Sequence, residues 1–214
     1  MVPVTALGQA ARALVAGELV IVPTARWYML CCAAADSVAC RQLTMAKRRP
    51  RCQPLLLVPE PGATERRFVL GPYARRLAVA FWPGELALVL PWRDPGDPLA
   101  SEPALGTGRT ALVARPDDLL GELATAAGCP VAASSANVSG TLAADGAGPA
   151  TTVEAALRFA RDSAAAVSVV VDGKRCDRWG PLTVVDCTDP DTGPTVVRAG
   201  ALSAAVVRSV LVGQ

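Results

Sequence analysis

The sequence predicts a single α/β domain over residues 1–214, built on a mixed β-sheet with flanking helices. Three observations support this. The chain has 214 residues, of which 51% are hydrophobic and 19% charged, enough to bury a sizeable core. Short apolar runs alternate with helical stretches through the first part of the chain, and the predicted strands cluster near its end. Alternation favours parallel pairing and clustering favours antiparallel pairing, so the sheet should contain both.

Strands are predicted where a compact apolar or β-branched run is bounded by Pro, Gly or polar residues. The run LVIV, which ends at Pro23, is an example of a buried strand. The predicted strands are 19–22, 54–58, 86–90, 110–114, 130–134, 168–172, 182–187 and 195–198.

Helices are predicted from residues that start and stop them. Thr5 and Asp36 are candidate N-caps, Thr151 or Thr152 caps a later helix, and Gly128 ends another. The predicted helices are 5–17, 36–48, 63–80, 117–127, 152–161 and 202–211. Stretches 91–109, rich in Pro and Gly, and 140–150, rich in Gly and Ala, are predicted loops.

The composition excludes several classes of chemistry. The chain has no histidine, which removes Ser-His-Asp and Cys-His nucleophile systems and imidazole zinc sites. Net charge is only +2, which argues against a general polyanion binder. Charges interrupt every apolar run before it reaches the length of a membrane span. No membrane contact and no protein-held metal are therefore expected.

The seven cysteines indicate a reducing environment. They form no C-x-x-C pair, and the first twenty residues lack the charged start and apolar core of a secretory signal. We therefore expect a cytoplasmic protein whose thiols are reduced and mostly buried.

The segment 41–76 carries most of the positive charge. Its nine Lys and Arg residues against two Glu give +7, in a chain whose total is +2. Lys47 and Arg49 fall near the end of a predicted helix, where cations are favourable in themselves. The segment is therefore either a capped helix with solvated arginines or a phosphate clamp, and composition alone favours the first.

Three polar segments follow predicted strands, where open α/β sheets bind ligands. The first contains Thr24 and Tyr28, whose hydroxyls either orient a small ligand or belong to a turn that fills the core. The second contains Ser135 and Asn137, an anion-binding bend or an ordinary polar loop. In the third, Arg198 either binds an anion or pairs with Asp186.

Taken in order, these segments resemble the YrdC/TsaC family of threonylcarbamoyl-AMP synthases. The family pattern runs PTET-x-YGL, K-x-RP…PL, FWPGPLT, SANxSG, STVVD and RxG. Here the corresponding blocks are PTARWYML (23–30), KRRP…PL (47–55), FWPGELA (81–87), SANVSG (135–140), LTVVD (182–186) and RAG (198–200). The resemblance runs from residue 9 to about 202 and implies a twisted, open α/β sheet with a concave, positively charged cavity.

The resemblance also implies a reaction. Threonine and bicarbonate would give an N-carboxylated amino acid, whose carboxylate attacks the α-phosphate of ATP and releases pyrophosphate. Mg²⁺ would arrive with the nucleotide. Partner proteins would pass the threonylcarbamoyl group to tRNA, which this chain would meet only indirectly. The resemblance also assigns roles to residues of this chain. Lys47 and Arg49 match the family's phosphate-binding pair, and Thr24 and Tyr28 match positions at the amino-acid end. Ser135, Asn137 and Arg198 match nucleotide-binding positions.

Several positions depart from the family pattern. Its acidic residue and second Thr after PT are Ala25 and Arg26 here, and the Gly after Tyr is Met29. The other departures are Glu85 for Pro, Ala87 for Thr, Leu182 for Ser, Val58 near the usual His, and Arg115 one step out of register with the usual Arg. Losing groups that bond a substrate hydroxyl would shift specificity.

Three functions are therefore compatible with the sequence. The chain is a divergent threonylcarbamoyl-AMP synthase, a specialised paralogue that transfers a carbamoyl or acyl group through an adenylate to another substrate, or a non-catalytic module that binds a nucleotide or RNA. The first is slightly favoured over the second, and both over the third.

Overall fold

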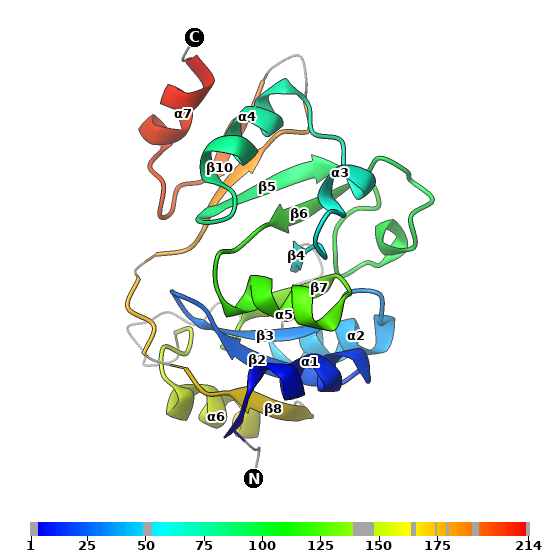
Figure 1. Ribbon diagram of the computed structural model, residues 1–214, viewed down its shortest axis with the longest axis vertical. Coiled ribbons are helices and arrows are strands. Elements are labelled where there is room, and N and C mark those ends of the chain that lie inside the picture. The colour runs from blue at the N-terminus through cyan, green and yellow to red at the C-terminus, as the bar shows by residue number, and fades with distance from the viewer. Residues whose placement is uncertain are drawn as a thin grey trace.

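The computed structural model describes residues 4–48, 53–138, 148–163, 166–173, 175–178, 180–189 and 193–212, and shows one long twisted sheet (Figure 1). Its strand order is β1-β8-β2-β3-β7-β4-β6-β5-β9-β10. The strands are β1 (Val4–Thr5), β2 (Leu19–Pro23), β3 (Tyr28–Ala33), β4 (Leu56–Val58), β5 (Leu86–Pro91), β6 (Thr110–Ala114), β7 (Val131–Ser135), β8 (Val167–Val171), β9 (Thr183–Asp186) and β10 (Thr195–Arg198).

The sheet is mixed, which confirms the predicted fold class. β4 pairs with β6, and β5 with β9, in parallel. β3 is antiparallel to both β2 and β7. The central position of β7 places the loop after Ser135 near the middle of the sheet.

Helices cover both faces of the sheet. Along β2, Leu19 and Ile21 belong to one core cluster, while Val20 and Val22 belong to the other, because side chains alternate along a strand. This double burial explains the continuous apolar run. The helices are α1 (Leu7–Val15), α2 (Ser37–Ala46), α3 (Thr64–Arg67), α4 (Pro72–Phe81), α5 (Leu119–Ala127), α6 (Val153–Asp162) and α7 (Ala204–Val212).

The two cores define which helices lie on which face. The core that contains Leu14 of α1 and Leu123 of α5 lies on one face. The core that contains Leu43 of α2, Leu77 of α4 and Val207 of α7 lies on the other. α1 and α5 pack against each other, and a pocket lies on their face, at the N-terminal end of α5.

Most predicted helix ends are confirmed. Asp36 Oδ1 accepts hydrogen bonds from Val38 N at 2.9 Å and Ala39 N at 3.0 Å, which caps α2. Thr152 caps α6, and Gly128, at φ +63°, ends α5. These caps satisfy backbone groups that a helix end leaves without intrahelical partners.

The structure also corrects three predictions. Thr5 does not cap α1: it lies in β1, and the helix begins at Leu7 without a side-chain cap. The strand β3 was not predicted, because it begins almost directly after the turn that contains Thr24, Ala25 and Arg26, and its first residues were assigned to that turn. The predicted helix 63–80 is two helices, since Phe68 turns extended to bridge Trp92 and Pro72 starts a new helix.

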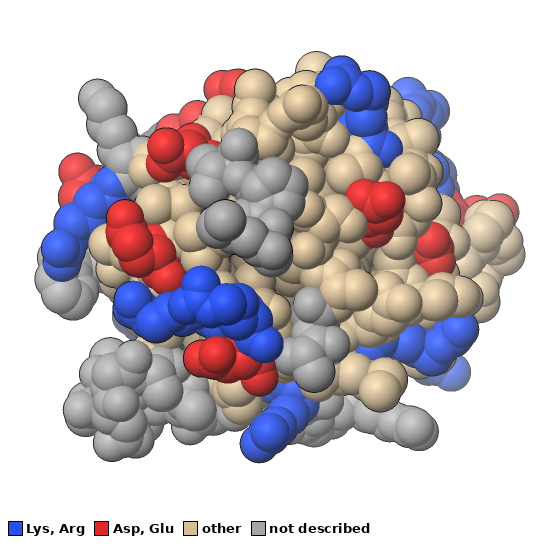
Figure 2. Space-filling view, turned by 90° about the horizontal axis from the view of Figure 1, so that it is seen from below, with Lys and Arg blue, Asp and Glu red and all other residues tan. Residues whose placement is uncertain are grey.

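The lower face of the molecule carries dispersed charge. Seen from below, Lys and Arg side chains lie among Asp and Glu side chains on a mostly uncharged face (Figure 2). Within the described ranges, no helix is long and apolar enough to cross a membrane. The thiols of Cys31, Cys32, Cys40 and Cys176 are buried, as predicted, whereas Cys129 and Cys187 are half-buried.

Candidate functional site

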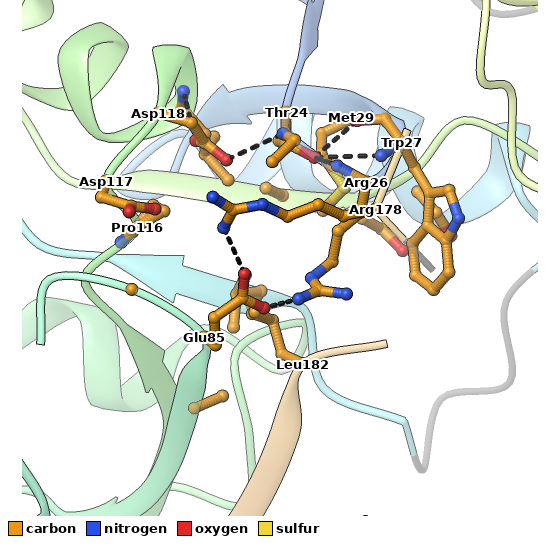
Figure 3. Close-up of a pocket in the computed structure, with 18 of the residues that line it drawn as sticks. Thr24, Arg26, Trp27, Met29, Glu85, Pro116, Asp117, Asp118, Arg178 and Leu182 are labelled. Carbon is orange, nitrogen blue, oxygen red and sulfur yellow. Dashed lines mark hydrogen bonds and ion pairs between the residues drawn. The ribbon is translucent and has the colours of Figure 1, made fainter. Parts of the chain in front are cut away.

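A pocket of about 160 Å³ opens beside the N-terminus of α5 (Figure 3). Its walls come from the turn after β2, the start of β5, the segment before α5 and the end of β7. Predicted site residues Thr24, Ser135 and Arg198 all line it. This pocket is therefore the place where three separate sequence motifs meet.

The floor of the pocket is aliphatic. Met29 of β3, Ala87 of β5 and Ala133 of β7 are buried there, side by side with side chains of the neighbouring strands. All of these residues belong to, or pack against, the core on the α1 and α5 face. The aliphatic residues of the floor are Met29, Leu56, Ala87, Leu112, Leu120, Ala133 and Leu182.

Charged side chains line the rim. Glu85 forms ion pairs with both Arg26 and Arg178, one through each carboxylate oxygen (Figure 3). Arg26 also donates to Gly180 O at 2.8 Å and is only 7% exposed. Burial, and then the nearby charge of Arg178, lower the pKa of Arg26. We call Arg26, Glu85 and Arg178 the charged rim.

Asp118 joins the rim to α5. Its Oδ1 caps the helix by accepting from Leu120 N at 3.0 Å, and its Oδ2 accepts from Ala25 N at 3.2 Å. Burial raises the pKa of this carboxyl above its ordinary value, against the opposing effect of those two bonds. One side chain thus holds the turn after β2 against the start of a helix.

Thr24 and Tyr28 have different environments. Thr24 Oγ1 donates to Trp27 O at 2.8 Å and accepts from the backbone N–H groups of Arg26 and Trp27, which closes the turn. Tyr28 is fully buried, donates to Gly173 O at 3.0 Å, and is not among the residues that line the pocket. Its burial raises the pKa of the phenol to about 12. Thr24 thus faces the pocket, whereas Tyr28 supports it from behind.

Lys47 lies at the C-cap of α2, where it reaches the segment Ser135–Asn137, which we call the SAN loop. Its ammonium donates to Ser135 O, to Asn137 O at 2.6 Å and to Asn137 Oδ1 at 3.2 Å. Ser135 Oγ donates to Asn137 Oδ1 at 2.7 Å. Lys47 is 1% exposed. The structure therefore brings Lys47, Ser135 and Asn137 into one hydrogen-bonded group, of which Ser135 lines the pocket.

Arg198 lines the pocket from the end of β10. Its guanidinium donates to Leu182 O at 3.0 Å and 3.3 Å, and burial lowers its pKa. Asp186 instead accepts from Thr188, at 2.8 Å from the backbone N and 2.6 Å from the hydroxyl. Arg49 and the end of the SANVSG block, residues 139–140, lie outside the described residues.

Part of the basic segment 41–76 forms ion pairs away from the pocket. Arg67 pairs with Asp97 at 2.7 Å and with Glu60 at 3.4 Å, and Arg66 pairs with Glu60 at 3.5 Å. These three pairs involve none of the residues that line the pocket. The segment thus combines one buried lysine beside the SAN loop with arginines that form ion pairs near the surface.

Sequence reasoning missed part of this site. Arg26 and Glu85 were noticed only as departures from a pattern, and Asp118 and Arg178 were not singled out. In the sequence each of these residues looks like an ordinary surface charge, because its partner is far away in the chain. Arg26 and Glu85, for example, are 59 positions apart. One signal in the sequence could have pointed to this ion pair. Arg26 and Glu85 have opposite charges, and both stand where the family pattern has uncharged residues.

The fold and site together define an α/β protein with a pocket on an open mixed sheet. The chain belongs to the Sua5/yciO/yrdC family, described as "Telomere recombination", which matches residues 12–200. The resemblance drawn from the sequence blocks is thereby confirmed.

Relatives are similar over nearly the whole chain. It is 31% identical to "Threonylcarbamoyl-AMP synthase" of Bacillus subtilis over 96% of this chain and 56% of that protein. The protein of the same name from Pyrococcus abyssi is 30% identical, over 91% of this chain and 54% of its own length. A relative from Mycobacterium tuberculosis is 33% identical over 94% and 87% respectively. The chain thus spans little more than half the length of the first two relatives.

Solved structures show the same fold. The crystal structure of Pyrococcus abyssi Sua5 complexed with L-threonine superposes with a TM-score of 0.79 at 27% identity, covering 96% of this chain and 57% of that one. Escherichia coli YciO superposes with a TM-score of 0.73 at 21% identity, covering 91% and 89%. The open mixed sheet with flanking helices is therefore the fold of this family.

Proposed function

We propose that this chain forms a carbamoyl-adenylate from ATP, bicarbonate and an amino acid, the reaction of a threonylcarbamoyl-AMP synthase. Family membership and the names of its relatives support this proposal. The single observation that carries it within the molecule is the contact of Lys47 with the SAN loop. Residues 88 and 90 positions apart in the sequence meet there, at the edge of the pocket.

The chain's own residues have separable tasks in this reaction. Lys47 keeps the SAN loop in one conformation, so that its backbone and Ser135 present fixed dipoles to an anion. Arg198 and Arg49 supply positive charge for the phosphates, and Thr24 shapes the amino-acid end. A transfer at phosphorus depends mostly on positioning and on neutralising charge, so the absence of histidine is no obstacle.

Mg²⁺ would enter as part of the substrate. In the part of the chain that the structure describes, no three His, Cys, Asp or Glu side chains gather closely enough to hold a metal ion. ATP carries Mg²⁺ on its own phosphates and needs few protein ligands for it. We further propose a cytoplasmic location, downstream transferase partners, and an indirect contact with tRNA through those partners.

The second candidate is a specialised paralogue that acts on another substrate. The observation that favours it is the charged rim, because both Arg26 and Glu85 differ from the family pattern and pair with each other. The third, a non-catalytic module that binds a nucleotide or RNA, has no such observation in its favour.

Pyrophosphate release from ATP tests the proposal. We expect release that requires both bicarbonate and an amino acid, with L-threonine as the first amino acid to try. Omitting each component in turn is the control. Tight ATP or RNA binding without release under any combination would favour the binding module, and release with carbamoyl phosphate alone would favour the paralogue.

A further inference from the structure

We propose that the pocket takes an aliphatic amino acid of threonine's size, such as L-valine, at least as well as L-threonine itself. This inference rests on the proposed function and names its amino-acid class. It follows from four observations: where the departures from the family pattern lie, how large the pocket is, which hydroxyls are already bonded, and where the charges lie.

The departures gather in one place. Of the eight positions that differ from the family pattern, six line this pocket: Ala25, Arg26, Met29, Glu85, Ala87 and Leu182. The motif blocks themselves border this cavity, so the nature of the changes carries the argument rather than their number. Arg26 and Glu85 introduce charges that contact each other, and Ala87 and Leu182 replace hydroxyl side chains with aliphatic ones.

The size of the cavity fits an amino acid. At about 160 Å³ it is close to the apolar cavity of roughly 150 Å³ that holds a benzene ring. A molecule with the eight non-hydrogen atoms of valine or threonine is of similar size. A nucleotide is several times larger and would have to extend toward the SAN loop.

The floor has lost the two hydroxyls that the family pattern places there. Ala87 and Leu182 stand where the pattern has Thr and Ser, and both lie on the aliphatic floor. The nearby hydroxyl of Thr24 already donates to Trp27 O, and that of Ser135 donates to Asn137 Oδ1. Burying a hydroxyl without a partner costs free energy, whereas a methyl group there gains it. From these two replacements we expect threonine to lose its advantage over valine.

The charged rim suits the other end of the molecule. An α-amino acid carries a carboxylate and an amine on one carbon. Arg26 or Arg178 can donate hydrogen bonds to the carboxylate, since a guanidinium has more N–H groups than its ion pair with Glu85 uses. Glu85, which pairs with both arginines, can accept a hydrogen bond from the amine (Figure 3). The pocket thus pairs a polar rim with an aliphatic floor, as the two ends of valine require.

The reaction is the same as with threonine. The amine nitrogen forms a bond to the carbon of bicarbonate, and water leaves with a proton from the amine. An oxygen of the resulting carbamate then bonds to the α-phosphorus of ATP, whose bond to pyrophosphate breaks. The products are the carbamoyl-adenylate of valine, pyrophosphate and water.

The test compares matched pairs of amino acids in bicarbonate-dependent pyrophosphate release. L-Threonine is compared with L-valine, and L-serine with L-2-aminobutyrate, since each pair differs by a hydroxyl in place of a methyl group. We expect kcat/KM for L-valine to equal or exceed that for L-threonine. A preference for threonine of tenfold or more would overturn the inference and leave the proposed function standing.

Two variants reinstall the missing hydroxyls. Leu182→Ser and Ala87→Thr should each shift the preference toward L-threonine by about tenfold, since a site built to bond a hydroxyl discriminates strongly. Val169→Thr makes the same kind of change on β8, away from the residues that line the pocket, and should leave the preference unchanged. Equal shifts in all three variants would contradict the assignment.

Direct binding separates the two proposals. Titration of L-valine and L-threonine into the chain, followed by calorimetry, measures the preference without turnover. Absence of pyrophosphate release with every amino acid would contradict the proposed function, but the binding preference would still test this inference. Binding of L-valine at least as tight as that of L-threonine supports it. Binding of L-valine that is tenfold weaker, or no binding of either amino acid, overturns it.

Discussion

The SAN loop and the charged rim border the same pocket, but the first keeps the family's residues and the second replaces them. On the SAN side, Lys47 donates to oxygens of Ser135 and Asn137 and is almost fully buried. On the rim, Arg26 and Glu85 stand where the pattern has uncharged residues, and they contact each other.

The difference lies in what holds each side together. A buried ammonium bonded to backbone oxygens can be exchanged for few other residues, since any smaller or apolar side chain leaves those oxygens without a donor. An ion pair between two side chains can be gained or lost as a unit. Change in substrate is therefore expected on the rim, while the SAN loop stays constant.

The largest effect is expected at Lys47. Lys47→Met keeps the apolar stem and removes the donors, which should lower the free energy of unfolding by about 3 kcal/mol. Adenylate formation should be lost as well. Urea unfolding measures the first effect, with Arg41→Met, an exposed position on the same helix, as the control. An unchanged unfolding midpoint for Lys47→Met would contradict the view that the bonds of Lys47 hold the SAN loop in place.

A smaller effect is expected on the charged rim, where the ion pair of Glu85 with Arg26 can be compared with its ion pair with Arg178. The Arg26 side chain is 8% exposed and the Arg178 side chain 50%. A double-mutant cycle of Arg26→Met with Glu85→Gln should give a coupling energy of about 2 kcal/mol. The same cycle with Arg178→Met should give less than about 1 kcal/mol, because solvent screens an exposed pair. Equal couplings would contradict the unequal burial of the two arginines.

The smallest effect is expected at Asp118. Asp118→Ala removes the cap of α5 and the bond to Ala25 N, and should cost about 1 kcal/mol. Asp118→Asn keeps an oxygen that can cap the helix and should cost less. Thermal unfolding of the three proteins measures this order, and equal losses in both variants would show that the cap is not the cause.

The same aspartate should make stability depend on pH. Burial raises its pKa in the folded state above the unfolded value, so the folded state binds this proton more tightly. The contribution of Asp118 to stability is thus greatest below the unfolded pKa, and it declines as pH rises through the folded pKa. The stability of the wild type relative to Asp118→Asn should fall over that interval, and a rise there would contradict the shift.

Much of the fold could be predicted from local sequence. Asp36, Thr152 and Gly128 mark helix ends by chemistry that acts within a few residues, so they were found correctly. β3 and the break near Phe68 were missed, because both depend on partners elsewhere: β3 on β2 and β7, and Phe68 on its bridge to Trp92.

By itself the sequence determined the alternation of strands and helices, the exclusion of histidine chemistry, and the set of motif residues, because these depend on residue type and short spacing. Only the tertiary structure decided that Lys47 bonds the SAN loop, that Tyr28 lies behind the pocket, and that Arg26 meets Glu85. The physical reason is that burial and ion pairing depend on distances in space, which the pairing of distant strands sets.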